Sequence, residues 1–112
     1  MISKKIEKLL NQQIDLEADS SSFYLAMASW AERSGYNGVS AFLYRHSDEE
    51  RLHMLKLIKF VNERGGAALI PALKSPPINF KGVSEVFELL LKHEVKVSNE
   101  INKLVEHCLA DK

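Results

Sequence analysis

The 112-residue sequence predicts an all-α fold in one domain, with three long helices packed side by side. In three long segments, apolar residues recur every three or four positions, which is the spacing of one helix face. Each of these apolar stripes is interrupted near its middle by a glutamate. No long segment alternates apolar and polar residues as a half-buried strand does, so no sheet is expected.

The first helix is expected at about 3–34, because Ser3 suits its N-cap and Gly35 its end. The second helix is expected at about 38–64 and stops at Gly65-Gly66. The link between them is so short that the two helices must be antiparallel neighbours. The first stripe comprises Leu10, Ile14, Glu17, Ser21, Tyr24, Ala28 and Ala31. The second comprises Val39, Leu43, His46, Glu50, His53, Leu57 and Phe60.

Residues 66–82 contain Pro71, Pro76 and Pro77 and show no helical period, so they predict an extended crossover. At about 3.3 Å per residue such a segment spans about 55 Å, whereas a helix of about 27 residues is only about 40 Å long. The crossover can therefore return along the whole bundle, and the third helix, at about 83–109, is expected to be parallel to the second. The third stripe comprises Val83, Phe87, Leu90, Glu94, Val97, Ile101 and Leu104.

Four side chains are predicted to meet at the middle of the bundle. Glu50 and His53 share one helix face, because their spacing is i, i+3. Glu17 lies about as far before the hairpin as His53 lies after it, and Glu94 lies about as far into its helix as Glu50. Buried carboxylates either take up protons or bind cations, so a cation site is predicted. The alternative is a solvated helix face or a buried polar group that fixes helix register.

Composition excludes some classes of partner. Fifteen basic and fifteen acidic residues balance, which argues against nucleic acid as the main partner. No segment approaches the roughly 20 apolar residues of a membrane span, and charges interrupt the N-terminal run MISKKIEKLL, unlike a signal peptide. Cys108 is the only cysteine, so no internal disulfide forms and a reducing, cytoplasmic setting is expected.

At this point the chain resembles non-haem bacterial ferritin over essentially all of its 112 residues. The resemblance rests on the run FLYRHSDEERLH at residues 42–53, on ERGG at 63–66, on Gln13-x-x-Leu16-Glu17 and on His93-Glu94. It implies a ferritin-like four-helix bundle of which three long helices are present, with a long crossover between the second and the third. It also implies iron storage: Fe(II) binds at a di-iron centre, dioxygen or peroxide oxidises it, and Fe(III) is stored as mineral inside a homo-oligomeric shell.

The resemblance also implies roles for individual residues. Glu17, Glu50 and His53 match the ligands of the first iron, with Glu50 bridging, and Glu94 matches a ligand of the second. Tyr24 matches a tyrosine near the centre with a redox or hydrogen-bonding role, and Glu49 matches a ligand of a third iron. Val97, three residues after Glu94, stands where bacterioferritin and rubrerythrin have the histidine of a second Glu-x-x-His motif. The surroundings of Met54 do not match those of the haem methionine, so a core methionine and no haem are predicted.

The family has a fourth long helix, whereas this sequence ends where the third helix should end and a turn should begin, at residues 109–112. We expect that the natural chain is longer; alternatively, a second copy supplies the missing packing surface. An oligomer is expected in either case. Two other functions stay open. One is a truncated or engineered three-helix structural unit that self-assembles through its open groove without ferroxidase activity, and the other is a helical module that binds a partner helix.

Four other residues are expected to have structural roles. His46 is interpreted as a core residue or a support for the ligands rather than as a ligand. His93 and His107 are expected at the surface. Cys108 is expected to pack as a small apolar residue.

Overall fold

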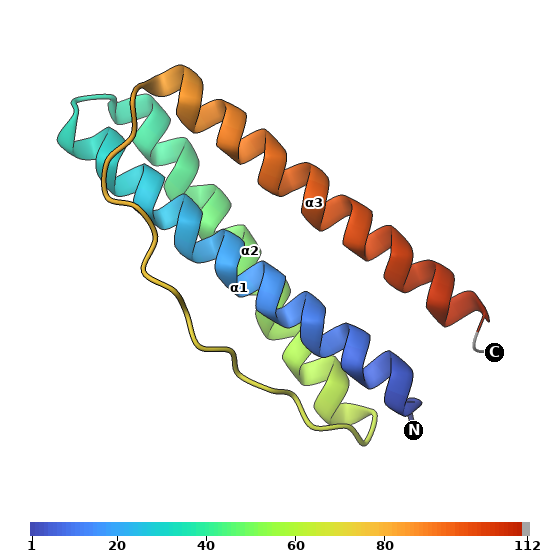
Figure 1. Cartoon of the computed structure of the whole chain (residues 1–112). Helices are drawn as coiled ribbons and strands as arrows, with labels where there is room; N and C mark the ends of the chain where they lie inside the picture. The colour runs from blue at the N-terminus through green and yellow to red at the C-terminus, as the bar shows by residue number, and fades with distance from the viewer. Residues whose placement is uncertain (111–112) are drawn as a thin grey trace.

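The computed structural model describes residues 1–110 and forms three helices in this range, with no strand. They are α1 (Lys4–Arg33), α2 (Asn37–Glu63) and α3 (Val83–Ala110). In Figure 1, α1 and α2 run antiparallel, and α3 runs in the same direction as α2. The all-α prediction is confirmed, whereas the turn expected after α3 falls on residues 111–112, outside the described range. No helix among the described residues is long and apolar enough to cross a membrane.

Local sequence signals set the ends of the first two helices. Ser3 caps α1, since its hydroxyl accepts a hydrogen bond from the backbone N–H of Ile6 at 3.2 Å. Gly35 follows the last turn of α1 with φ +85°, a left-handed conformation that glycine adopts without strain. Gly65 does the same after α2. At the next position, Gly66, an added Cβ would lie 3.0 Å from the side chain of Val61, so the chain passes close to α2 there.

A reciprocal pair of serines fixes the register of α1 against α2. The Ser21 hydroxyl donates to the carbonyl of Ser47 at 2.8 Å, and the Ser47 hydroxyl donates to the carbonyl of Ser21 at 2.7 Å. Two turns nearer the hairpin end, Ser40 donates to the carbonyl of Ala28 at 3.1 Å. These contacts bring side chains of each helix onto the backbone of the other, so the two helices lie close together at a defined height.

The crossover returns along α1, and polar side chains of α1 hold its first part. Asn11 donates to the carbonyl of Ala67 at 3.1 Å and accepts from the N–H of Leu69 at 2.8 Å. Glu7 accepts from the N–H of Ala67 at 3.0 Å. The described crossover forms no strand and stays extended. It is therefore long enough to place the start of α3 at the hairpin end of the bundle (Figure 1).

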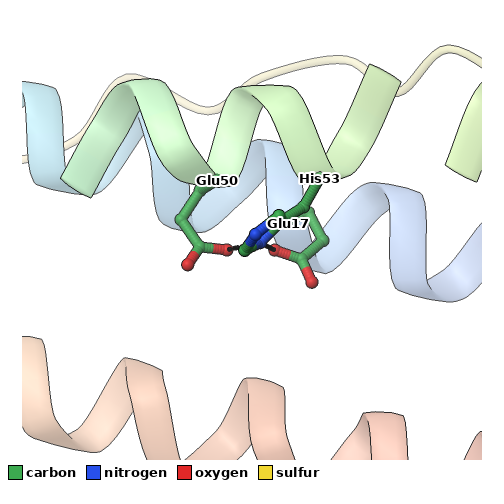
Figure 2. Close-up of side chains that lie close together, drawn as sticks. All are labelled: Glu17, Glu50 and His53. Carbon is green, nitrogen blue, oxygen red and sulfur yellow. Dashed lines mark ion pairs between the residues drawn. The ribbon is translucent and has the colours of Figure 1, made fainter. Parts of the chain in front are cut away.

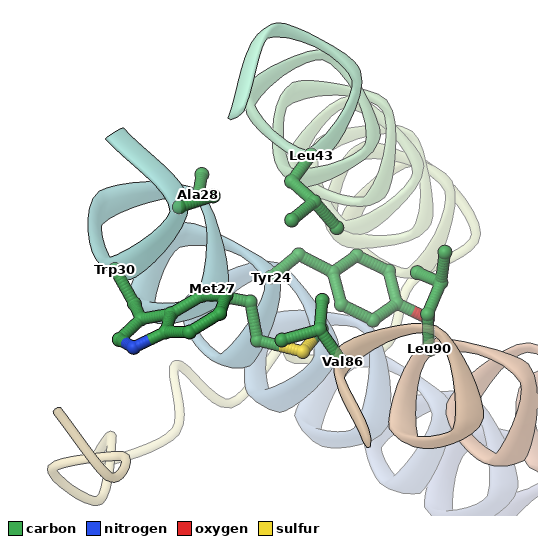
Figure 3. Close-up of a cluster of buried hydrophobic side chains, with 8 residues drawn as sticks. Tyr24, Met27, Ala28, Trp30, Leu43, Val86 and Leu90 are labelled. Carbon is green, nitrogen blue, oxygen red and sulfur yellow. The ribbon is translucent and has the colours of Figure 1, made fainter. Parts of the chain in front are cut away.

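The apolar core consists of two clusters, one toward each end of the α1–α2 pair. Figure 3 shows the cluster near the hairpin, which includes Tyr24, Met27, Ala28, Trp30, Ala31, Leu43, Val86 and Leu90. The other cluster comprises Ile6, Leu10, Ile14 and Val61. Glu17 and Glu50 lie between these clusters along α1 and α2, so polar groups interrupt the core at mid-height.

Helix α3 packs against α1, and within residues 1–110 its backbone does not approach that of α2 as α1 does. Long side chains cross the remaining gap, for example Phe42 and Phe87, whose ring centroids lie 6.0 Å apart. Phe87 and Ile101, predicted on the buried stripe, are therefore 40% and 39% exposed. Cys108, in the last turn of α3, is exposed and does not pack as predicted.

The serine pair yields a prediction on stability. Ser47→Ala should lower the free energy of unfolding by about 1–2 kcal/mol, because the carbonyl of Ser21 loses its donor. Urea unfolding of Ser21→Ala, Ser47→Ala and the double variant should show that the two effects are not additive, since the residues share their hydrogen bonds. Ser98→Ala, at an exposed position of α3, is the control and should change stability by less than about 0.5 kcal/mol. Strict additivity of the two substitutions would contradict the coupling.

Candidate metal centre

Two buried glutamates and one histidine converge where α1 faces α2. Glu17 comes from α1, and Glu50 and His53 come from successive turns of α2 (Figure 2). The His53 Nδ1 atom lies 3.8 Å from Glu17 Oε2 and 3.7 Å from Glu50 Oε2. Glu17 is 1% and Glu50 4% exposed, while the side chain of His53 is 52% exposed. One ligand atom from each residue lies within 4.8 Å of the other two, so the three groups surround a common point.

The carboxylates are buried without enough hydrogen-bond donors. Glu17 Oε2 and Glu50 Oε2 are buried, and neither has a hydrogen-bond partner. An unpaired charge in such a position costs several kcal/mol, about the effective penalty for desolvating one ion. A divalent cation between these oxygen atoms and His53 would remove the cost, and two carboxylates with one imidazole form a donor set that Fe²⁺ and Zn²⁺ both accept. The residues present therefore fit a cation.

Gln13 holds Glu17 in place. Its amide donates to Glu17 Oε1 at 3.0 Å, one helical turn away, and Gln13 is itself buried. Because this bond occupies Oε1, it leaves Oε2 directed at His53. In the sequence, Gln13 stands out only as part of a family motif. Its i, i+4 spacing from Glu17 was the available signal, since such pairs face each other on a helix.

The closeness of the two buried carboxylates affects the protonation of Glu50. Burial, together with the neighbouring carboxylate of Glu17, raises the pKa of Glu50 to about 9. Glu94 and the exposed Glu49 add smaller repulsions in the same direction. Without a cation, Glu50 therefore keeps its proton at neutral pH, and a cation that binds there has to displace it.

Glu94 lies outside this three-residue group and makes a separate set of contacts. The Tyr24 hydroxyl donates to Glu94 Oε1 at 3.1 Å, and His46 Nδ1 lies 3.4 Å from the same oxygen. Burial, followed by the charge of Glu94, raises the pKa of Tyr24 well above its usual range, so Tyr24 stays protonated as a donor. Glu49 is exposed on α2.

His93 and Met54 lie outside the group of Glu17, Glu50 and His53. His93 was predicted at the surface but is half-buried: its ring stacks on Phe23 with centroids 4.6 Å apart, and its Nδ1 lies 3.3 Å from the Ser20 hydroxyl. Burial lowers the pKa of His93. Met54 packs against the apolar cluster near Ile6, as expected for a core methionine.

Comparison with known proteins places the chain among ferritins. A sequence model described as "Ferritin-like domain" matches residues 7–112. The chain is 41% identical over 112 residues to a "Bacterial non-heme ferritin" of Campylobacter jejuni, covering all of this chain and 67% of that protein. It is 39% identical to a "Probable bacterial non-heme ferritin-like protein" of Haemophilus influenzae, covering 68% of it.

Solved structures agree with this placement. The Chlorobium tepidum ferritin superposes with a TM-score of 0.94 at 36% identity, over 99% of this chain and 68% of that one. An open-pore ferritin of Archaeoglobus fulgidus gives a TM-score of 0.92 at 36% identity, over 98% of this chain and 68% of that one. The chain thus spans about two thirds of the length of the relatives it matches.

The raised pKa of Glu50 predicts how stability changes with pH in the metal-free protein. Between about pH 4.5 and 9 the folded state holds a proton that the unfolded state has lost, so this group's contribution to stability falls as pH rises. Glu50→Gln mimics the protonated form and should be more stable than the unsubstituted protein at pH 8 by roughly 1–3 kcal/mol. The difference should shrink toward pH 4.

Urea unfolding in the presence of a chelator measures this difference. Glu88→Gln, at an exposed position on α3, is the matched control and should follow the unsubstituted protein at every pH. Parallel stability curves for Glu50→Gln and the unsubstituted protein would show that Glu50 does not carry the extra proton.

The hydrogen bond from Gln13 yields a prediction on cation affinity. Gln13→Met keeps the size of the side chain but removes the donor to Glu17, so Zn²⁺ should bind roughly tenfold more weakly. Isothermal titration measures the affinity. Gln12→Met, at the adjacent exposed position, should leave it unchanged. Equal affinities for the two variants would mean that Gln13 does not position Glu17.

Proposed function

We propose a function for this chain from one premise: it belongs to the ferritin family, through its match to the ferritin-like domain and its relatives at 39–41% identity. The proposed function is iron storage with ferroxidase activity by one ferritin-like domain over residues 1–112. Iron is the substrate and the cargo, and no haem takes part. The observation that carries the proposal is the pair of buried carboxylate oxygens, on Glu17 and Glu50, that face His53 without a partner.

The chemistry requires two ferrous ions. Each gives one electron to dioxygen, which takes up two protons from solvent and leaves as hydrogen peroxide. Peroxide in turn accepts two electrons from a further pair of ferrous ions and two protons from solvent, and leaves as two waters. Glu17, Glu50 and His53 would bind the first ion, and Glu94, with Glu50 as bridge, would serve the second. The negative charge of the carboxylates favours the ferric product.

Two further residues have proposed roles. Tyr24 holds Glu94 through its hydroxyl, and because it stays protonated it would fix that carboxylate before iron arrives. Glu49 is proposed as a ligand for a third ion on the way to the mineral. Its exposed position beside Glu50 supports this role, because ferric ions must leave the centre toward solvent.

Assembly into a homo-oligomeric shell in the cytoplasm completes the proposal. Exposed apolar side chains along the crossover support association, since a monomer rarely leaves so many uncovered; they are Leu69, Ile70, Leu73 and Ile78. The free thiol of Cys108 is compatible with a reducing compartment.

A second candidate function is a structural unit that self-assembles without oxidising iron. The exposed apolar side chains of α3 favour it; they are Phe87, Leu91, Val95, Ile101 and Val105. Titration with Fe²⁺ separates the two functions. Stoichiometric binding followed by ferric absorbance in air supports the ferroxidase, and the absence of binding supports the structural unit.

Glu50 is the residue whose loss should slow oxidation most, because in the proposed function it would bind both ferrous ions. Glu50→Ala should slow the oxidation of added Fe²⁺ at least about tenfold, to the rate of iron in buffer, as a ligand loss should exceed the effect of losing a supporting contact. Stopped-flow absorbance after mixing with aerated buffer measures the rate. Glu88→Ala, an exposed glutamate of α3, should oxidise iron normally. Equal rates for the two variants would refute the ferroxidase role of this site.

A further inference from the structure

Aromatic side chains connect the interior beside the candidate metal centre with the surface at the hairpin end. Tyr24, whose hydroxyl donates to Glu94, is fully buried, and Trp30 is also buried. The indole of Trp30 stacks on the ring of Tyr36, with centroids 5.8 Å apart and an angle of 30° between the planes. Tyr36 is 45% exposed, so the series of rings that begins at Tyr24 ends in solvent.

A first route joins Tyr24 to Trp30 along α1. Met27 lies three residues from each of them, and residues at this spacing are neighbours on a helix surface. Figure 3 shows the side chain of Met27 between the two rings, and all three residues belong to the apolar cluster near the hairpin. Six residues correspond to about 9 Å along the helix axis. The two rings are therefore close enough for one electron to pass between them.

A second route passes through ring contacts between α1, α3 and the crossover. His93 meets Tyr24 edge-on with centroids 5.7 Å apart and stacks on Phe23 at 4.6 Å. Phe80 of the crossover meets Phe23 at 6.0 Å and Trp30 at 5.9 Å, edge-on in both cases. Electronic coupling falls steeply with distance, so an unbroken series of ring contacts favours electron transfer.

The rings of this series differ in their redox chemistry. Tyrosine and tryptophan lose one electron to strong oxidants far more readily than phenylalanine does. Peroxide is such an oxidant, and in the proposed function it takes its two electrons from two ferrous ions. When the centre holds a single ferrous ion, peroxide lacks the second electron. Tyr24 is an oxidisable side chain at this point, and its hydroxyl already donates to a carboxylate that can accept the proton.

We propose that Trp30 and Tyr36 form an electron relay that restores Tyr24 after its oxidation and moves the oxidising equivalent to the surface. This inference rests on the proposed function, which supplies the peroxide. In the first step, peroxide takes one electron from a ferrous ion and one from Tyr24. It gains two protons from solvent and leaves as two waters, while the hydroxyl proton of Tyr24 passes to Glu94.

Each later step moves one electron toward the interior. Trp30 gives an electron to the Tyr24 radical, which regains its proton from Glu94. Tyr36 then gives an electron to the Trp30 radical cation, and the hydroxyl proton of Tyr36 passes to solvent. A water-soluble one-electron donor such as ascorbate reduces the Tyr36 radical, which regains a proton from solvent. Without the relay, the radical would stay near Met27, whose thioether is itself open to oxidation.

Flash photolysis without iron tests the relay separately from the proposed function. A photo-oxidised ruthenium tris-bipyridine complex in solution takes an electron from the exposed ring of Tyr36, and a tryptophan radical should follow in the transient absorbance. This signal belongs to Trp30, because the sequence contains one tryptophan. Tyr36→Phe keeps the stacked ring but should lose the fast phase of the signal. Tyr44→Phe is the matched control and should retain it, since the Tyr44 hydroxyl bonds Glu32 and belongs to neither route.

A second measurement follows the radical after one Fe²⁺ per chain is mixed with hydrogen peroxide and ascorbate. Freeze-quench electron paramagnetic resonance should show a tyrosyl radical that lasts several-fold longer in Trp30→Phe than in the unsubstituted protein. The ferric absorbance should appear at the same rate in both, because Trp30 is not a ligand. Circular dichroism checks that each variant folds.

The competing explanation is that these rings only pack in the core. It predicts equal radical lifetimes in Trp30→Phe and the unsubstituted protein, and an unchanged fast phase in Tyr36→Phe. Either result overturns the relay. If no ferric absorbance forms, the proposed function has failed, and the loss or retention of the fast phase in Tyr36→Phe still decides whether Trp30 and Tyr36 exchange electrons.

Discussion

The burial of two carboxylates against each other, Glu17 on α1 and Glu50 on α2, is the constraint around which the rest of the molecule is arranged. Both are almost fully buried, and each keeps one oxygen without a donor. Such a pair is tolerated only with a proton or a cation between the charges. Gln13 orients the carboxylate of Glu17, and the half-exposed His53 leaves the site accessible from solvent. The arrangement that costs stability therefore also provides a place for a cation.

That arrangement depends on the register of the hairpin. A slip by one residue would turn a helix by about 100° and would move a glutamate out of the interface. The paired hydroxyls of Ser21 and Ser47 prevent such a slip, since each bonds the backbone of the opposite helix. The two apolar clusters above and below the glutamates contribute most of the burial, and their separation leaves the polar level between them.

Helix α3 is held differently. It packs on α1 through Val86, Leu90 and Val97, and it meets α2 through side chains that span the gap, among them Glu94 and His46. The centre is open to solvent on the side where the side chain of His53 is half exposed. Any surface that covered this side would exclude water and strengthen the electrostatic interactions within the centre.

The sequence determined the helices and one half of the site, because both are local. Helical period and glycine stops define α1 and α2, and a short hairpin fixes which residues of the two helices share a height, so Glu17, Glu50 and His53 could be brought together from spacing. Only the tertiary structure placed Glu94 beside Tyr24 and His46, because the height and rotation of α3 depend on how it packs against α1 after a long extended crossover. It also decided that His93 is half-buried while Phe87 and Cys108 are exposed. Periodicity identifies an apolar face, but which part of that face is covered depends on where the neighbouring helices lie.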